Sequence, residues 1–427
     1  MIVSKPLSPI ISTTPYKVVL PFYLYAALSF LAATLLLFFS TDAFLKHYFQ
    51  PHILAITHIM ALGWATMIIL GASHQLVPVL IEGKLYSNTL AHTSFILAAI
   101  GIPLLSYGFY EFNMGAPAKW GGRFVVLAML AYLINIGKSI AKSKNENVHA
   151  VFVFTSVLWL LVTVALGLAL LYNFTFPFMR HDSVHYLPLH AHIGIIGWFL
   201  LLVMGVASRL IPLFLISKYS NPRLLWAIYW LINFSLVAFI LIFYFLPLSF
   251  SLIPNLLLIT AVLLFIYYCR AAYHQRIRKK VDEQVKLSIL SAVMMALPLV
   301  FLGIILAMFI NRHTENNALM VAYGFIIFFG WLTAIILGMT FKTLPFIVWN
   351  KVYHRKAGLG KTPNPKDLFS NTVFKWMSVA YLLGFCIFIC GLFFPNAHLL
   401  KPGAFLLLLT AILYNWNVLK ILNHKAP

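Results

Sequence analysis

The chain has 427 residues, of which 62% are hydrophobic and only 9% are charged. Soluble domains carry roughly a quarter charged residues, so this composition excludes an ordinary soluble protein and is typical of a polytopic membrane protein. The formal net charge is +21. That charge suits a nucleic-acid-binding protein unless the basic residues lie in loops on one side of a bilayer.

Apolar segments long enough to cross a bilayer recur along the whole chain. A span needs about 20 mostly apolar residues, and this criterion predicts an all-α polytopic protein with twelve spans in a single membrane domain, 1–427. The predicted spans are 18–40, 53–81, 90–107, 123–141, 149–173, 187–216, 224–246, 251–269, 287–311, 318–349, 373–393 and 402–421.

The basic residues predict the orientation of these spans. When the N-terminus, the even-numbered loops and the C-terminus are placed on one side, most of the 30 lysines and arginines fall there, many of them in 270–286 and 351–375. Cytoplasmic loops are enriched in such residues. We therefore expect a multi-pass protein of a bacterial-type inner membrane with both termini in the cytoplasm. The basic loops face lipid headgroups and explain the charge without nucleic acid.

A 21-residue pattern occurs three times. The first copy, HIMALGWATMIILGASHQLVP, covers 58–78, and the others cover 192–212 and 325–345. Each copy has Gly-Trp at its sixth and seventh positions, and successive Gly-Trp pairs are 134 and 133 residues apart. A fixed period indicates a repeated structural unit. We predict three pseudo-repeated four-helix units with the motif on the second helix of each, approximately 17–145, 146–286 and 287–427.

The glycines of the motif have two alternative roles. Small residues let helices approach each other closely, and the same space would also accommodate a flat macrocycle. The sequence leaves both roles open for all six glycines, which are Gly63, Gly71, Gly197, Gly205, Gly330 and Gly338.

Four histidines lie inside the predicted spans or at their outer ends: His52, His58, His190 and His192. An ionisable residue inside a membrane is a functional candidate. His58 and His192 begin two copies of the motif, so a pseudo-threefold arrangement would bring them together as two haem ligands. His190 points away from His192 on a helix, and it or His52 would serve a second haem or a copper ion. A hydrogen-bonded structural role is the alternative for each.

The third copy of the motif lacks a histidine. Phe325 takes the position of His58 and His192, and Tyr323 takes that of His190. Tyr323 is therefore a candidate donor of a hydrogen bond or a proton. The alternative is an interfacial tyrosine near the outer surface.

Polar residues also mark the two ends of the motif helices. At the inner end, Gln75, Arg209 and Lys342 share one position. The two cations would either extend to lipid headgroups or bind an anion such as a haem propionate. At the outer end, His181 and His185 lie just outside the sixth span, where they would join the other histidines or form a mouth.

The span pattern resembles subunit I of the haem-copper oxidase and nitric oxide reductase superfamily. The motif similarity lies in span two, HILAITHIMALGWATMIILG, where that family has a low-spin haem ligand. The resemblance implies this role for His58, with His52 as its rival. The chain departs from the family elsewhere: its H-x-H, in LHAHIG, lies on span six instead of span ten, and span seven, WAIYWLINFSLVAFILIFYFL, lacks a histidine pair for copper.

In size and span number the chain is similar to NnrS-type membrane proteins of the nitric oxide response. The resemblance implies haem b, since no CxxCH motif for covalent haem is present, together with copper as a second cofactor. It also implies a redox partner or a small gaseous ligand such as nitric oxide. We expect nitric oxide handling or respiratory electron transfer, with oxidoreductase chemistry if the protein is an enzyme. The alternatives are a transporter or delivery protein for metal or haem, and an assembly partner with relic ligands.

Overall fold

The computed structural model describes residues 14–143, 147–277, 282–312, 316–354 and 362–426. The predicted unit boundary at 145–146 and parts of both basic loops, 278–281 and 355–361, lie outside these ranges. The described residues contain twelve helical segments long and apolar enough to cross a membrane. The predicted all-α fold with twelve spans is therefore confirmed.

Eight spans are single helices, and four consist of more than one helical segment. The single helices are α1 (Tyr16–Phe39), α4 (Asn88–Tyr110), α5 (Ala116–Ala141), α6 (Val148–Thr175), α9 (Pro222–Phe245), α10 (Leu252–His274), α15 (Asn371–Phe393) and α16 (Ala397–Leu422). The composite spans are α2–η2–α3 (Pro51–His58, Ile59–Thr66, Met67–Leu80), α7–η3–α8 (Leu187–His192, Ile193–Leu200, Leu201–Leu215), α11–α12 (Glu283–Met294, Ala296–Arg312) and α13–η5–α14 (Asn317–Phe325, Ile326–Leu332, Thr333–Tyr353).

Short polar caps begin many of these helices. A side-chain oxygen at the N-cap accepts a hydrogen bond from a backbone N–H that has no partner within the helix. Because unpaired backbone groups are costly at the edge of a membrane, these caps fix where the spans begin. The capping residues are Ser87, Asn147, Asn221, Asn316, Ser370 and Asn396.

Each copy of the sequence motif contains a π-helical segment, and the three segments begin at the same place in the motif. They are η2, η3 and η5, which each start one residue after the first motif position and include the Gly-Trp pair. A π-helical segment widens the helix and shifts the direction of the side chains that precede it, and such segments often occur at functional sites. Here they lie directly below the histidines of spans two and six.

The six motif glycines pack against neighbouring helices. A Cβ atom at Gly63 would approach Ser29 of α1 to 2.7 Å, and one at Gly197 would approach Trp159 of α6 to 2.7 Å. A Cβ atom at Gly71, Gly205, Gly330 or Gly338 would similarly come within 3 Å of a neighbouring helix. None of the six is among the residues that line the main cavity. Of the two predicted roles, the structure favours close helix packing.

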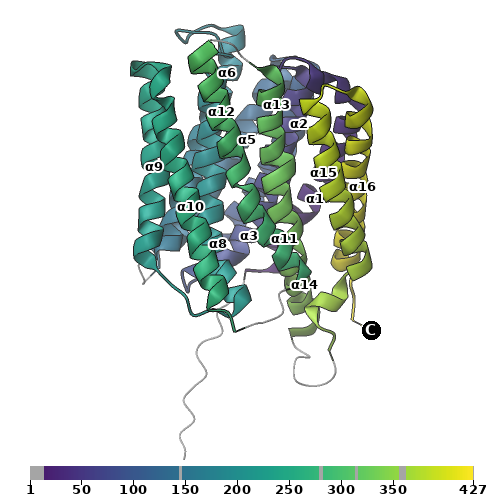
Figure 1. Ribbon diagram of the computed structural model, residues 1–427. Helices are drawn as coiled ribbons and strands as arrows, with labels where there is room; N and C mark the ends of the chain where they lie inside the picture. Colours follow the sequence, from purple (N-terminus) through teal and green to yellow (C-terminus); the bar gives the residue numbers. More distant parts are fainter. Residues whose placement is uncertain (1–13, 144–146, 278–281, 313–315, 355–361, 427) are drawn as a thin grey trace, which may run out of the picture.

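Span nine differs from the other spans. It is interrupted at Met295, between α11 and α12, and it is the least buried of the twelve, with 22% of its most apolar window buried. No residue from 300 to 311 is buried. Figure 1 shows α12 standing between α10 and α13 at one face of the bundle. The outer half of this span therefore forms a thin wall.

Candidate functional site

A cavity of about 970 Å³ lies among the N-terminal ends of the motif helices. Ligand pockets have volumes of roughly 300–1,000 Å³, so this cavity has room for a large cofactor. Its wall is mostly apolar, and it includes His58, His190, His192 and Tyr323. The residues that the sequence singled out on three separate helices thus line one space.

His58 and His190 form a pair inside this cavity. Their ring centroids are 6.3 Å apart and their planes differ by 16°. The Nδ1 atom of His58 lies 2.8 Å from the Leu54 carbonyl oxygen, and that of His190 lies 3.1 Å from the Thr163 carbonyl oxygen. A carbonyl oxygen only accepts, so in the neutral rings Nδ1 carries the proton and donates it. The lone pair is then on Nε2 in both rings.

The position of His190 depends on a glycine in the fifth span. A Cβ atom at Gly167 would lie 2.8 Å from Cε1 of His190, so only glycine leaves room for this ring. Thr163, which accepts the Nδ1 hydrogen bond, lies one helical turn before Gly167 on the same face of α6. Neither residue could be recognised as part of a site from the sequence, because a glycine and a threonine in an apolar helix give no local signal.

His192 has a different partner. Its Nδ1 atom lies 2.6 Å from the Pro188 carbonyl oxygen, and its Nε2 atom lies 3.3 Å from the Tyr323 hydroxyl. Because Nδ1 donates to the carbonyl, Nε2 accepts from the tyrosine O–H. Repeat position alone suggested that His58 would face His192. In the structure the ring beside His58 is that of His190, and His192 faces Tyr323.

The remaining outer histidines lie at the margin of the cavity or beyond it. His52 stacks on Tyr110, with ring centroids 4.7 Å apart, and does not line the cavity. His185 does line it, and its ring is tilted against that of His181, with centroids 4.3 Å apart. Both His181 and His185 are exposed. An outer mouth formed by these two residues remains a prediction.

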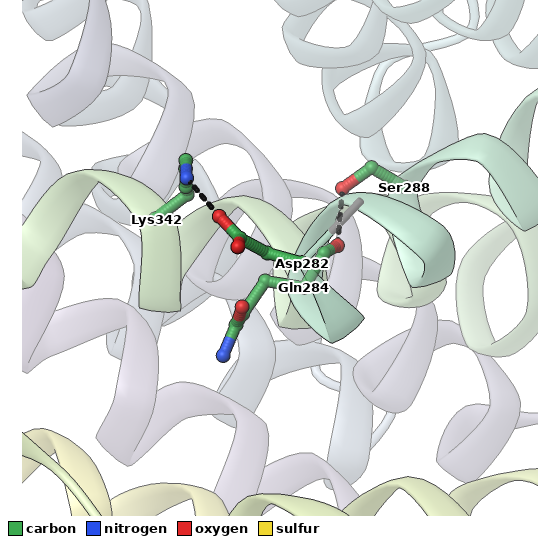
Figure 2. Close-up of polar contacts among 4 residues, drawn as sticks. All are labelled: Asp282, Gln284, Ser288 and Lys342. Carbon is green, nitrogen blue, oxygen red and sulfur yellow. Dashed lines mark hydrogen bonds and ion pairs between the residues drawn. The ribbon is translucent and has the colours of Figure 1, made fainter. Parts of the chain in front are cut away.

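The two cations at the inner end do not line the cavity. Figure 2 shows Lys342 of α14 paired with Asp282, which immediately precedes α11; the Nζ and Oδ2 atoms are 2.5 Å apart. Arg209 is exposed in the second half of α8. Lys342 thus already has an anionic partner, and the exposed position of Arg209 suits a headgroup contact. Neither supports the predicted pairing with a haem propionate.

The same close-up shows how α11 approaches α14. The Ser288 hydroxyl donates to the Gln284 carbonyl oxygen over 3.0 Å (Figure 2). Gly338 of α14 faces these two residues, and a Cβ atom there would clash with both. The ion pair and the glycine contact therefore hold the inner ends of α11 and α14 together.

The donor set was compared with the two predicted cofactors. Among the described residues, no group of three or more His, Cys, Asp or Glu side chains is arranged to hold a metal ion. An isolated copper ion would need such a group, so copper does not fit the described side chains. A haem iron takes only axial ligands from the protein. Among the cavity-lining residues, His58 and His190 are the candidates for that role, because their rings lie 6.3 Å apart.

Comparisons with known proteins support the fold and do not identify a family. No family model and no curated protein sequence matches the chain. Among solved structures, the chain is similar to a heme-copper terminal oxidase studied as a dimer by cryo-electron microscopy. The TM-score is 0.63 at 12% identity, and the match covers 95% of this chain and 85% of that one. The chain is thus a multi-pass membrane protein whose fold is that of a heme-copper terminal oxidase subunit.

Proposed function

We propose that the cavity binds haem b between His58 and His190 and that the protein transfers electrons within the membrane. The observation that carries this proposal is the distance between the two rings. An imidazole nitrogen binds a transition metal at about 2 Å, so two rings that ligate one ion from opposite sides have centroids about 6 Å apart. The observed 6.3 Å and the near-parallel planes meet that requirement.

The surroundings of the two rings support this assignment. The carbonyl groups of Leu54 and Thr163 fix the tautomer that leaves Nε2 free, which is the usual arrangement of a metal-ligating histidine. The described lining has no Lys or Arg side chain, and Asp182 and His185 stand at its outer mouth. A haem held here would supply reversible one-electron transfer.

Ligation from both sides favours electron transfer over nitric oxide handling. A haem iron with two axial histidines has no open coordination position for a gas. His192 already accepts a hydrogen bond from Tyr323, so it is not free to act as a third ligand. We infer a redox partner on the outer side. From the distribution of basic residues, we also infer that both termini lie in the cytoplasm and that the membrane is a bacterial-type inner membrane.

The alternative of a transporter has less support. Transporters of the inverted-repeat type have broken helices at corresponding positions of their repeats. In this chain, Pro78, Pro212 and Pro345 lie within continuous helices. The break at Met295 has no counterpart in α1 or α6, which are continuous. The broken-helix arrangement is therefore not repeated in the described chain.

The proposal is tested by the optical spectrum of protein expressed with a supply of haem. We expect a Soret band and sharp α and β bands in the reduced state. Each of His58→Ala and His190→Ala should abolish the low-spin spectrum, whereas His192→Ala and His52→Ala should retain it. Equal loss in His192→Ala would assign the ligands differently, and a wild-type protein without a Soret band would refute the proposal.

A further inference from the structure

The tryptophans of the three motifs form a chain of hydrogen bonds around the centre of the bundle. Trp198 Nε1 donates to Thr66 Oγ1 over 3.0 Å, and Trp64 Nε1 donates to Thr333 Oγ1 over 3.2 Å. In both cases the acceptor is the residue two positions after the Gly-Trp pair of another motif. Each tryptophan is almost completely buried. The tryptophan of the second motif copy thus donates a hydrogen bond to the first copy, and the tryptophan of the first copy donates one to the third.

The third bond is missing. By the same rule Trp331 would donate to residue 200 of the second copy, but that residue is Leu200, which has no acceptor. Trp331 is only 2% exposed, and its Nε1 atom has no hydrogen-bond partner among the described residues. An unpaired buried donor is costly. The defect follows directly from one amino-acid difference between the motif copies.

A small pocket lies at this defect. Its volume is about 20 Å³, and Trp331 and Leu200 both line it. A pocket needs about 10–15 Å³ by this measure to hold one water molecule, so it has room for one very small molecule. Tyr323 and Leu302 line both this pocket and the main cavity, so the two spaces adjoin.

We propose that the pocket binds one small neutral hydrogen-bond acceptor, which accepts from Trp331 Nε1 and takes the place of the missing threonine hydroxyl. The ligand is either a water molecule, which accepts the hydrogen bond fully, or a diatomic gas, which is a much weaker acceptor and would be held mainly by the apolar wall. The remaining wall is apolar, and a gas dissolved in the bilayer would reach the pocket through the adjoining cavity. This site does not depend on whether the cavity holds haem.

The test uses nuclear magnetic resonance of the full chain in lipid nanodiscs, with ¹⁵N-labelled indole groups. Trp331→Phe assigns the Trp331 signal, and the indole signals of Trp64 and Trp198 are internal controls that already have partners. Under dioxygen, a bound gas should enhance relaxation of the Trp331 N–H several-fold over the two controls. Under argon, a bound water should give a cross-peak to the Trp331 indole proton.

Two variants of Leu200 complete the test. Leu200→Thr supplies the missing hydroxyl, and Leu200→Val has the same shape without it. The dioxygen effect or the water cross-peak should disappear in the threonine variant and persist in the valine variant. Relaxation of the Trp331 N–H equal to that of the controls, together with no water cross-peak in the wild type, would overturn the proposal. So would identical behaviour of the two variants.

Discussion

His58 and His190 come from the second and the sixth spans, yet their rings lie 6.3 Å apart with nearly parallel planes. The Nδ1 atom of His58 donates a hydrogen bond to a backbone carbonyl of its own helix, and that of His190 donates to a backbone carbonyl of α6. These two hydrogen bonds restrict the orientation of both rings. This preorganisation reduces the conformational cost of ligand binding.

Gly167 is predicted to be essential for that pair. Gly167→Ala places a methyl group against the His190 ring and should displace it, so we expect a loss of at least tenfold in haem affinity, as for the loss of a supporting contact at a metal site. Gly324→Ala is a matched control, because Gly324 also lines the cavity but a Cβ atom there meets nothing within 4 Å. Haem titration measures the haem affinity of both variants. Equal haem affinities would contradict the predicted role of Gly167.

The broken tryptophan chain predicts an unusual order of stabilities. Leu200→Thr should be more stable than Leu200→Val by up to about 1 kcal/mol, the net value of one hydrogen bond, because threonine offers Trp331 a side-chain acceptor and the valine variant depends on a bound small molecule. Both variants lose similar apolar volume relative to leucine, so their difference isolates the hydroxyl. Thermal unfolding in nanodiscs measures it. In a Trp331→Phe background the advantage of threonine should vanish.

Lys342 is predicted to stabilise the inner ends of the helices without affecting cofactor binding. Its ion pair with Asp282 is partly buried, so Lys342→Met should lower stability by up to about 1 kcal/mol, and less at high salt. Lys286→Met is the control, since the Lys286–Glu283 pair is more than half exposed and should contribute almost nothing. Haem content should equal that of the wild type. A loss of haem in Lys342→Met would restore the propionate role.

The His192–Tyr323 hydrogen bond is predicted to couple spans six and ten. Tyr323→Phe leaves Nε2 of His192 without its donor and should destabilise the protein by about 1 kcal/mol. His192→Ala in the same background should then cost less than it does alone. A double-mutant cycle of unfolding free energies measures this coupling. Additive effects would show that the hydrogen bond contributes no net stability.

The spans could be predicted from the sequence because hydropathy and helix length are local properties. The predicted ranges 18–40 and 224–246 lie within about two residues of α1 and α9 at each end. Asparagine and serine caps determine several of the observed starts. The break of span nine at Met295 was not predicted, although Pro298 follows three residues later and lacks the N–H that a continuous helix needs there.

The pairing of the histidines could not be predicted in the same way. Repeat position gave His58 and His192 equal depth, and both donate Nδ1 to the carbonyl four residues earlier. Which ring faces which is decided by contacts from other helices: Gly167 and Thr163 place His190, and Tyr323 engages His192. These contacts join residues more than twenty positions apart, and no local periodicity reports them.

The thin outer half of α12 makes the bilayer a structural component of the cavity. From residue 300 to residue 311, one layer of unburied side chains separates the cavity from the surrounding acyl chains. The stiffness of that wall is therefore set jointly by the helix and by the order of the lipid beside it. A detergent micelle, a fluid membrane and a tightly packed membrane will enclose the same polypeptide in cavities of different compliance. We therefore expect lipid composition to alter the cavity in the way that a sequence change in span nine would.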